Sequence, residues 1–141
     1  MKIQHASLHN GIVRIDDKLS NFDALRSVTH IGRSLSICYN LHLRELSLPS
    51  LQYIGNQLSI AANDDLSKIA FPSLIHVAWV ALSDLPSLGS FCAENLTEIS
   101  HGFIADNSPK LSSVFIPSCE VATTSIVNTA LNTVNPFAMV T

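Results

Sequence analysis

The 141 residues of this chain suit one domain, and 47% of them are hydrophobic whereas only 13% are charged. The net charge of −3, without any run of lysine or arginine, argues against nucleic acid, which requires a basic surface. The first five residues lack the apolar stretch of a signal peptide, and no apolar stretch is long enough to cross a bilayer, so we expect a cytoplasmic protein.

The first 27 residues precede the regular part of the chain and are predicted to form an N-terminal cap. Two β-prone segments, Ile3 to Leu8 and Ile12 to Ile15, flank the sequence His9-Asn10-Gly11. Asn-Gly between two such segments is a strong local signal for a two-residue turn. We therefore expect these two segments to form a hairpin or paired strands that cap the first coil, followed by an irregular entry coil up to residue 27.

A repeat of about 23 residues fills positions 28–119. Its four copies start at Val28, Leu51, Leu74 and Leu96, at spacings of 23, 23 and 22 residues. Each copy contains two short alternating segments, in which the outer residues point one way and the middle residue points the other. Because no single copy can bury its apolar residues, the copies are predicted to stack as a parallel β-solenoid of about four coils. One internal column should then hold Leu35, Leu58, Val80 and Phe103.

The last segment, 120–141, leaves the repeat and is predicted to form a C-terminal cap. Ile126, Ala130, Leu131 and Val134 fit one face of a helix. An open solenoid end would expose both the core and an unpaired strand edge. We therefore expect a helical cap over this segment, in a single domain that spans 1–141.

The motif Leu58-x-Ile60-x-x-Asn63-x-x-Leu66-x-x-Ile69 resembles the leucine-rich repeat, in the longer variant found in receptor L domains and related bacterial surface repeats. The resemblance covers about residues 25–119. It implies a right-handed parallel β-solenoid and a binding role, usually toward proteins. The disulfide-rich caps of the extracellular members are absent from this chain.

The turn asparagine of the family is present in only half of the copies. Asn40 and Asn63 occupy that position in the first two copies, whereas Leu85 and Ser108 occupy it in the next two. The preceding residues there, Asp84 and Asn107, are candidate substitutes.

The outward positions of the first strand in each copy form the candidate binding face. They are small and almost uncharged: Ser36, Ser59, Ala81 and Ile104. Such a flat face is typical of a docking surface for a protein partner or a second copy, although another part of the chain could also cover it. Trp79, in the shortened third copy, either anchors a partner or fills the defect left by the missing residue.

A second candidate site involves His76 and Glu98, which fall on neighbouring coils in one column and could meet. His101 is near them in sequence. A catalytic zinc site needs at least three converging protein ligands, and this set barely reaches that number. The three cysteines have no metal-like spacing, which favours reduced thiols.

These patterns favour a non-catalytic interaction module that needs no cofactor or metal and uses Ser36, Ser59, Trp79, Ala81 and Ile104 to bind a protein partner or to form a homodimer. The first alternative is a small metal- or acid/base-dependent enzyme with its site near His76 and Glu98. The second is a purely structural subunit of an assembly.

Overall fold

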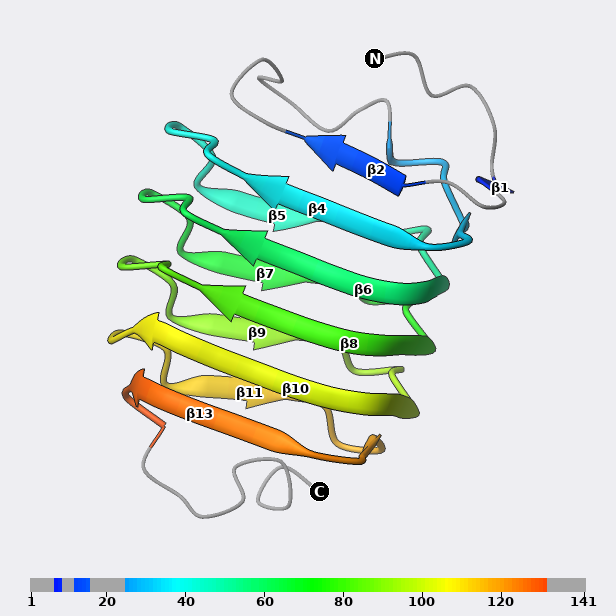
Figure 1. The fold of residues 1–141 in the computed structure, drawn as a ribbon. Coiled ribbons are helices and arrows are strands. Elements are labelled where there is room, and N and C mark those ends of the chain that lie inside the picture. The colour runs from blue at the N-terminus through cyan, green and yellow to red at the C-terminus, as the bar shows by residue number, and fades with distance from the viewer. Residues whose placement is uncertain (1–6, 9–11, 16–24, 132–141) are drawn as a thin grey trace.

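The computed structural model describes residues 7–8, 12–15 and 25–131. This part of the chain is a parallel β-solenoid of about four turns, in which two β-sheets face each other across one core, and it contains no α-helix (Figure 1). The nine-stranded sheet, here called sheet A, is made of β1 (Ser7–Leu8), β2 (Ile12–Ile15), β3 (His30–Ile31), β4 (Ser34–Cys38), β6 (Tyr53–Ala61), β8 (His76–Ser83), β10 (Glu98–Ser108), β12 (Glu120–Val121) and β13 (Thr124–Thr129). The four-stranded sheet B is made of β5 (Glu45–Ser47), β7 (Lys68–Ala70), β9 (Ser90–Cys92) and β11 (Ser113–Phe115).

Figure 1 shows the coils stacked in chain order, with the long strands of sheet A in front of the short strands of sheet B. All strand pairs are parallel, and each residue lies beside the residue one repeat later in the sequence. The predicted internal column is confirmed, because Leu35, Leu58, Val80 and Phe103 are successive Cα partners and each is fully buried.

The core fills the space between the two sheets and is almost wholly hydrophobic. The phenylalanines bridge the sheets near the third and fourth coils: Phe91 of sheet B lies 5.8 Å, edge-on, from Phe103 of sheet A. Phe71, which follows β7, lies 6.1 Å from Phe91. Because every coil adds residues to one continuous core, the stack stabilises coils that could not fold alone.

The predicted N-terminal hairpin is wrong. β1 and β2 do not pair with each other as antiparallel neighbours; β1 pairs in parallel with β3, and β2 pairs in parallel with β4. The ladder of sheet A thus extends ahead of residue 28. The Asn10-Gly11 turn itself lies outside the described residues. The local turn signal did not decide the pairing, because each of these strands pairs in parallel with a strand of the stack instead.

The predicted C-terminal helix is also wrong over its first part. Residues 124–129 form strand β13, which continues sheet A beside β10, and Ile126 is the Cα partner of Ala105. The helical spacing of the apolar residues was overridden by the open edge of β10, whose backbone groups need partners. Val134 lies outside the described residues.

Two corners between the sheets are closed by buried asparagine. Asn63 donates from Nδ2 to the carbonyl oxygens of Ile37 (3.0 Å) and Ala61 (3.1 Å). Its Oδ1 accepts from the backbone nitrogen (2.9 Å) and Nδ2 (3.0 Å) of Asn40 in the coil before. A buried polar side chain with this many partners fixes the path of the chain at the corner.

The next two corners are built differently. Leu85 and Ser108 take the buried positions. Asp84 and Asn107 remain exposed, with positive φ, and bond to each other through Asn107 Nδ2 and Asp84 Oδ1 at 2.9 Å. They connect neighbouring coils, as the asparagines do, but on the outside of the corner.

Candidate functional site

The outward face of sheet A brings the predicted binding residues together. Ser36 is the Cα partner of Ser59, Ser59 of Ala81, and Ala81 of Ile104, so these four residues form one straight column. All four are half-buried. Their neighbours across the strands and along them shield the small side chains, which leaves a smooth surface.

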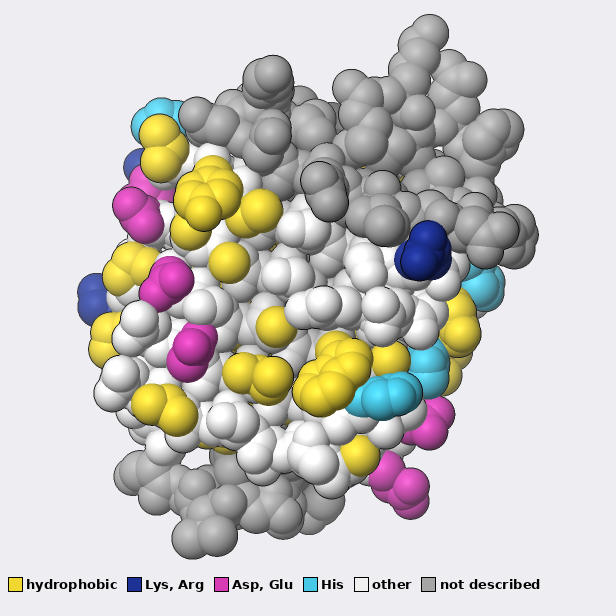
Figure 2. All heavy atoms as spheres, viewed as in Figure 1, with side chains coloured by type: hydrophobic (Ala, Val, Ile, Leu, Met, Phe, Trp, Pro, Cys, Tyr) yellow, Lys and Arg dark blue, Asp and Glu magenta, His cyan; other side chains and the backbone are white. Residues whose placement is uncertain are grey.

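Three outward columns make up this surface, which we call the A face. The strand-start column holds Gln57, Trp79 and Gly102; the central column holds Ser36, Ser59, Ala81 and Ile104; the strand-end column holds Cys38, Ala61, Ser83 and Asp106. From β4 to β10 Asp106 is the only charged residue in these columns, and the central column continues to Arg14 of β2, the Cα partner of Ser36. Figure 2 shows the result: a broad face of neutral polar and backbone atoms, with separate hydrophobic patches and charged side chains mainly at its margins.

The position of Trp79 follows from the one-residue deletion in its own coil. Between Val77 and Trp79 strand β8 has one residue, whereas β10 has two between the corresponding partners, so the neighbouring strand bulges there. A Cβ atom on Gly102 would lie 2.6 Å from Cζ3 of Trp79, which means that the indole ring packs directly over this glycine. Trp79 thus fills the defect and still remains half-exposed, so both predicted roles are compatible with its position.

Sequence reasoning missed the contact between Trp79 and Gly102. The shortened third copy was visible in the repeat spacing, and it is this shortening that shifts Trp79 to a position opposite a glycine. The repeat spacing therefore showed the deletion, but it did not show at which residue of the third copy the register with the fourth copy resumes.

The second candidate site is a ladder of rings at the rim where the strands of sheet A begin. Tyr53 stacks between His30 (5.9 Å) and His76 (4.9 Å, with an interplanar angle of 16°). His76 Nδ1 lies 3.2 Å from Glu98 Oε2, so the predicted meeting of these two side chains is present. Glu98 is 55% exposed, and an ion pair in such a position contributes little to stability.

His101 does not join His76 and Glu98. Its ring lies 5.8 Å from that of Trp79, on the adjacent part of the A face. Within the described ranges, no group of three or more His, Cys, Asp or Glu side chains converges as metal ligands would. Glu98 of the pair is more than half exposed to water, whereas acid–base catalysis generally excludes water to strengthen its electrostatics.

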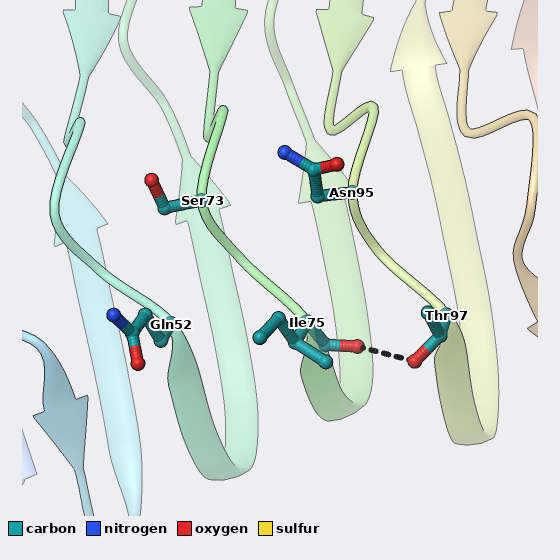
Figure 3. Close-up of a pocket in the computed structure, with 5 residues that line it drawn as sticks. All are labelled: Gln52, Ser73, Ile75, Asn95 and Thr97. Atoms are coloured by element: carbon teal, nitrogen blue, oxygen red, sulfur yellow. Dashed lines mark hydrogen bonds between the residues drawn. The ribbon is translucent and has the colours of Figure 1, made fainter.

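A shallow groove lies at the corners where the chain returns from sheet B to sheet A. It has a volume of about 460 Å³ and is lined by Gln52, Ser73, Ile75, Asn95 and Thr97 (Figure 3). Three of these side chains already donate hydrogen bonds to carbonyl oxygens of the preceding coil: Ser73 to Pro49, Asn95 to Pro72, and Thr97 to Ile75. The groove therefore holds coils together and offers no titratable group for chemistry.

The three cysteines are unpaired with one another. The pKa of the Cys119 thiol is raised to about 11, chiefly by burial. A hydrogen bond from the backbone of Ile99 lowers this pKa, and the nearby carboxylates of Glu120 and Glu98 raise it. Burial, followed by the charge of Glu94, also raises the pKa of Cys92. High thiol pKa values make these side chains weak nucleophiles at neutral pH.

The described part of the chain contains no helix that is long and apolar enough to span a membrane. Comparison with known proteins adds no assignment: no family model matches the chain, and no curated protein or solved structure is significantly similar to it.

Proposed function

We propose that this protein is a non-catalytic interaction module that binds a protein partner or a second copy through the A face. The observation that carries the proposal is the low charge of the three outward columns from β4 to β10, where Asp106 is the only charged residue; Arg14 of β2 pairs with Ser36 at the N-terminal end of the central column. Solvent-exposed sheet faces usually carry many charges, whereas the central parts of protein interfaces are depleted in them. Trp79 and Ile104 supply the larger apolar contacts that such interfaces use as anchors.

The proposal includes a leucine-rich-repeat type of coil with a right-handed path, in a cytoplasmic protein. The buried hydrogen bonds of Asn40 and Asn63 support the repeat type, since they occupy the turn position of the resembled family. Three thiols that form no disulfide support a reducing compartment.

The alternative enzyme at His76 and Glu98 has weaker support. The two side chains do meet, but the pair is exposed, and His76 stands beside Tyr53 in a stack. A stack that continues from coil to coil is explained by the repeat itself, without any substrate.

The test compares two arginine substitutions at matched small, outward positions. Ser59→Arg places a charge in the middle of the A face, where desolvating it on binding is costly. Ala70→Arg places the same charge in the middle of sheet B. Both variants are immobilised and exposed to extract of the native host, and the retained proteins are identified by mass spectrometry.

We expect at least one protein to bind the wild type and Ala70→Arg and to be lost with Ser59→Arg. Circular dichroism checks that both variants remain folded. If Ser59→Arg and Ala70→Arg retain the same proteins as the wild type, and Ser59→Arg also leaves the mass of the purified protein unchanged, the A face is not a binding surface.

A further inference from the structure

We propose that the groove at the return corners binds a neutral, extended saccharide that lies along the stack of coils. This inference is independent of the A face, because the groove lies where the chain returns from sheet B to sheet A. Three features of the groove lead to it: the neutral composition of its lining, the hydrogen-bonding groups that remain free there, and its direction along the repeat.

The lining of the groove is polar but carries no charge. Two amides, Gln52 and Asn95, and two hydroxyls, Ser73 and Thr97, surround the side chain of Ile75, which is 47% exposed. A phosphate, carboxylate or ammonium ligand would find no opposite charge among these five side chains to offset its desolvation. A saccharide needs none, because it combines hydroxyl groups with apolar C–H surface, and the lining offers a contact for each.

The free hydrogen-bonding groups of the groove suit hydroxyl groups. Ser73, Asn95 and Thr97 each use one donor on a carbonyl oxygen of the preceding coil, at 2.6, 2.6 and 3.1 Å. Their oxygen atoms keep lone pairs that can accept, and the exposed Gln52 brings a full amide that both donates and accepts. A sugar hydroxyl likewise donates and accepts, so it can pair with both kinds of group.

The backbone of the corners is already paired, which disfavours a peptide strand as the ligand. The nitrogen of Ile75 donates to the carbonyl oxygen of Gln52 at 2.8 Å, and the nitrogen of Thr97 donates to that of Ile75 at 3.0 Å. The nitrogen of Glu120 continues the series to Thr97. A peptide that adds to a sheet requires an edge with unpaired backbone groups. A saccharide instead uses the side chains of the groove.

The groove runs along the repeat. Figure 3 shows its side chains in two rows, with Ser73 and Asn95 in one row and Gln52, Ile75 and Thr97 in the other. Each row advances by one coil from residue to residue, and neighbouring coils are about 4.8 Å apart. This step is close to the length that one sugar adds to an extended glycan chain of the cellulose type. Successive sugars can therefore meet equivalent positions of successive coils.

Ile75 supplies the apolar contact of the groove. Aromatic rings often hold sugars through their faces, but the faces of Tyr53 are taken by His30 and His76. Ile75 lies in the middle of its row, with a polar side chain on either side (Figure 3). The C–H face of the central sugar then rests on Ile75, while its hydroxyl groups reach the amides and hydroxyls beside it.

The carboxylates nearest to the groove in sequence do not line it. Glu94 precedes Asn95 and Glu98 follows Thr97, but neither is among the lining residues, and Glu98 pairs with His76. Glycoside hydrolysis uses two carboxylates that flank the bond to be cleaved. The groove therefore holds a saccharide without hydrolysing it, in agreement with the proposed non-catalytic role.

The experiment titrates the isotope-labelled full chain with oligosaccharides and follows its NMR signals. The probes are straight oligomers of two to six sugars from cellulose, chitin and linear mannan. Malto-oligosaccharides, which curl, and spermidine, which is cationic, serve as comparisons. The side-chain amide signals of Gln52 and Asn95 report on the groove, and the indole signal of Trp79 reports on the A face.

Two variants test the polar contacts. Gln52→Ala removes the exposed amide. Asn95→Ser keeps a donor for Pro72, as Ser73 does for Pro49 one coil earlier, but loses the amide oxygen. Gln57→Ala removes an amide from the A face and is the matched control, and circular dichroism checks that the three variants remain folded.

We expect at least one straight series to shift the signals of Gln52 and Asn95, with dissociation constants in the millimolar range because the groove is shallow. Affinity should rise up to about three or four sugars and then level off, since the groove spans three coils. Gln52→Ala and Asn95→Ser should each weaken binding about two- to tenfold, as the loss of one hydrogen bond does, and Gln57→Ala should leave it unchanged.

Each part of the proposal has a result that overturns it. The absence of shifts with every straight series at tens of millimolar overturns the saccharide, and shifts centred on Trp79 overturn the groove as its site. Affinity that does not depend on length, or equal binding of the malto-oligosaccharides, overturns the extended arrangement along the coils. Tighter binding of spermidine than of any saccharide overturns the neutral ligand.

Discussion

The two sheets share one core but differ on their outer surfaces. Sheet A has strands of up to 11 residues, and from β4 to β10 its three outward columns hold one charged residue, Asp106. Every strand of sheet B has three residues, and its outer side sets Glu45 beside Lys68. The inner residues of both sheets are equally buried, as Leu58 and Ile69 show. The requirements of the core therefore cannot explain the difference outside. The reason for the difference lies outside the core, and the binding role that we propose for the outer face of sheet A would account for it.

The largest expected effect tests the shared half of this comparison. Leu58→Ala and Ile69→Ala should each lower the free energy of unfolding by about 2–5 kcal/mol, because each removes a buried side chain that neighbouring coils enclose on both sides. Chemical denaturation gives the values, with Ile75→Ala, at a position that is 47% exposed, as a control expected to change little. A loss below about 1 kcal/mol at either position would show that its sheet is not part of the core.

The corner that leads from sheet A to sheet B should be nearly as sensitive. Asn63→Leu would leave the backbone groups of Ile37 and Asn40 without the side-chain partner they now have, at a cost of about 1–3 kcal/mol for each buried group. The variant has a natural reference, since Leu85 takes this position one coil later. Asn95→Ala, which removes one exposed hydrogen bond, should cost less than half as much in the same denaturation experiment. Equal losses would mean that the buried corner has no special role.

A difference between the sheets is expected for two glycines. A Cβ on Gly55, in sheet A, would collide with the carbonyl oxygen of Gly32 in the coil before, whereas a Cβ on Gly89, just before β9 of sheet B, would meet only Ser67 O at 3.7 Å. Gly55→Ala should therefore cost about 1–3 kcal/mol, as overpacking does. Gly89→Ala should be close to neutral. Thermal unfolding of the two variants measures the contrast, and similar melting temperatures would refute the close approach of the coils at Gly55.

The smallest effect concerns the pKa of Cys119, at the corner after sheet B. Because the pKa of this thiol is raised to about 11 in the folded protein, its alkylation by iodoacetamide should stay slow at neutral pH and accelerate toward pH 11, in a background with Cys38→Ser and Cys92→Ser. The unfolded thiol ionises near pH 9. The folded state therefore binds the proton more tightly, and its contribution to stability, present below pH 9, is lost as the pH rises through 11. Rapid alkylation at pH 8 would contradict the burial of this thiol.

The repeat could be predicted from the sequence because each coil pairs with the next at the same spacing that the sequence repeats. The equal spacing of Leu35, Leu58, Val80 and Phe103 was sufficient to place them in one column, and the same spacing placed the central column of the A face. Both terminal predictions failed for one physical reason. The Asn10-Gly11 turn signal and the helical spacing around Ile126 are local, whereas the strands at both ends pair with a neighbouring coil.

The candidate site was only partly within reach of the sequence. The meeting of His76 with Glu98 followed from their column, and so did the small residues of the A face. The packing of Trp79 over Gly102 did not, because it depends on where the neighbouring strand takes up its extra residue. No repeat spacing states which outer face of a solenoid meets another molecule, since every column is equally regular.

Because of the bulge where the strands of sheet A begin, neighbouring coils can differ in length by one residue and still pair in the same register beyond it. Between matching positions of sheet A the fourth coil has Ser100 and His101 where the third has Ala78 alone, yet Val80 and Phe103 beyond them are again partners. At this rim one residue can be inserted or deleted in a coil as a β-bulge, and the residues after the bulge keep their register with the neighbouring coils. In a β-strand, a one-residue insertion usually moves every later side chain to the opposite face of the sheet. An insertion at this rim of the solenoid would leave the later side chains of the coil on their original faces.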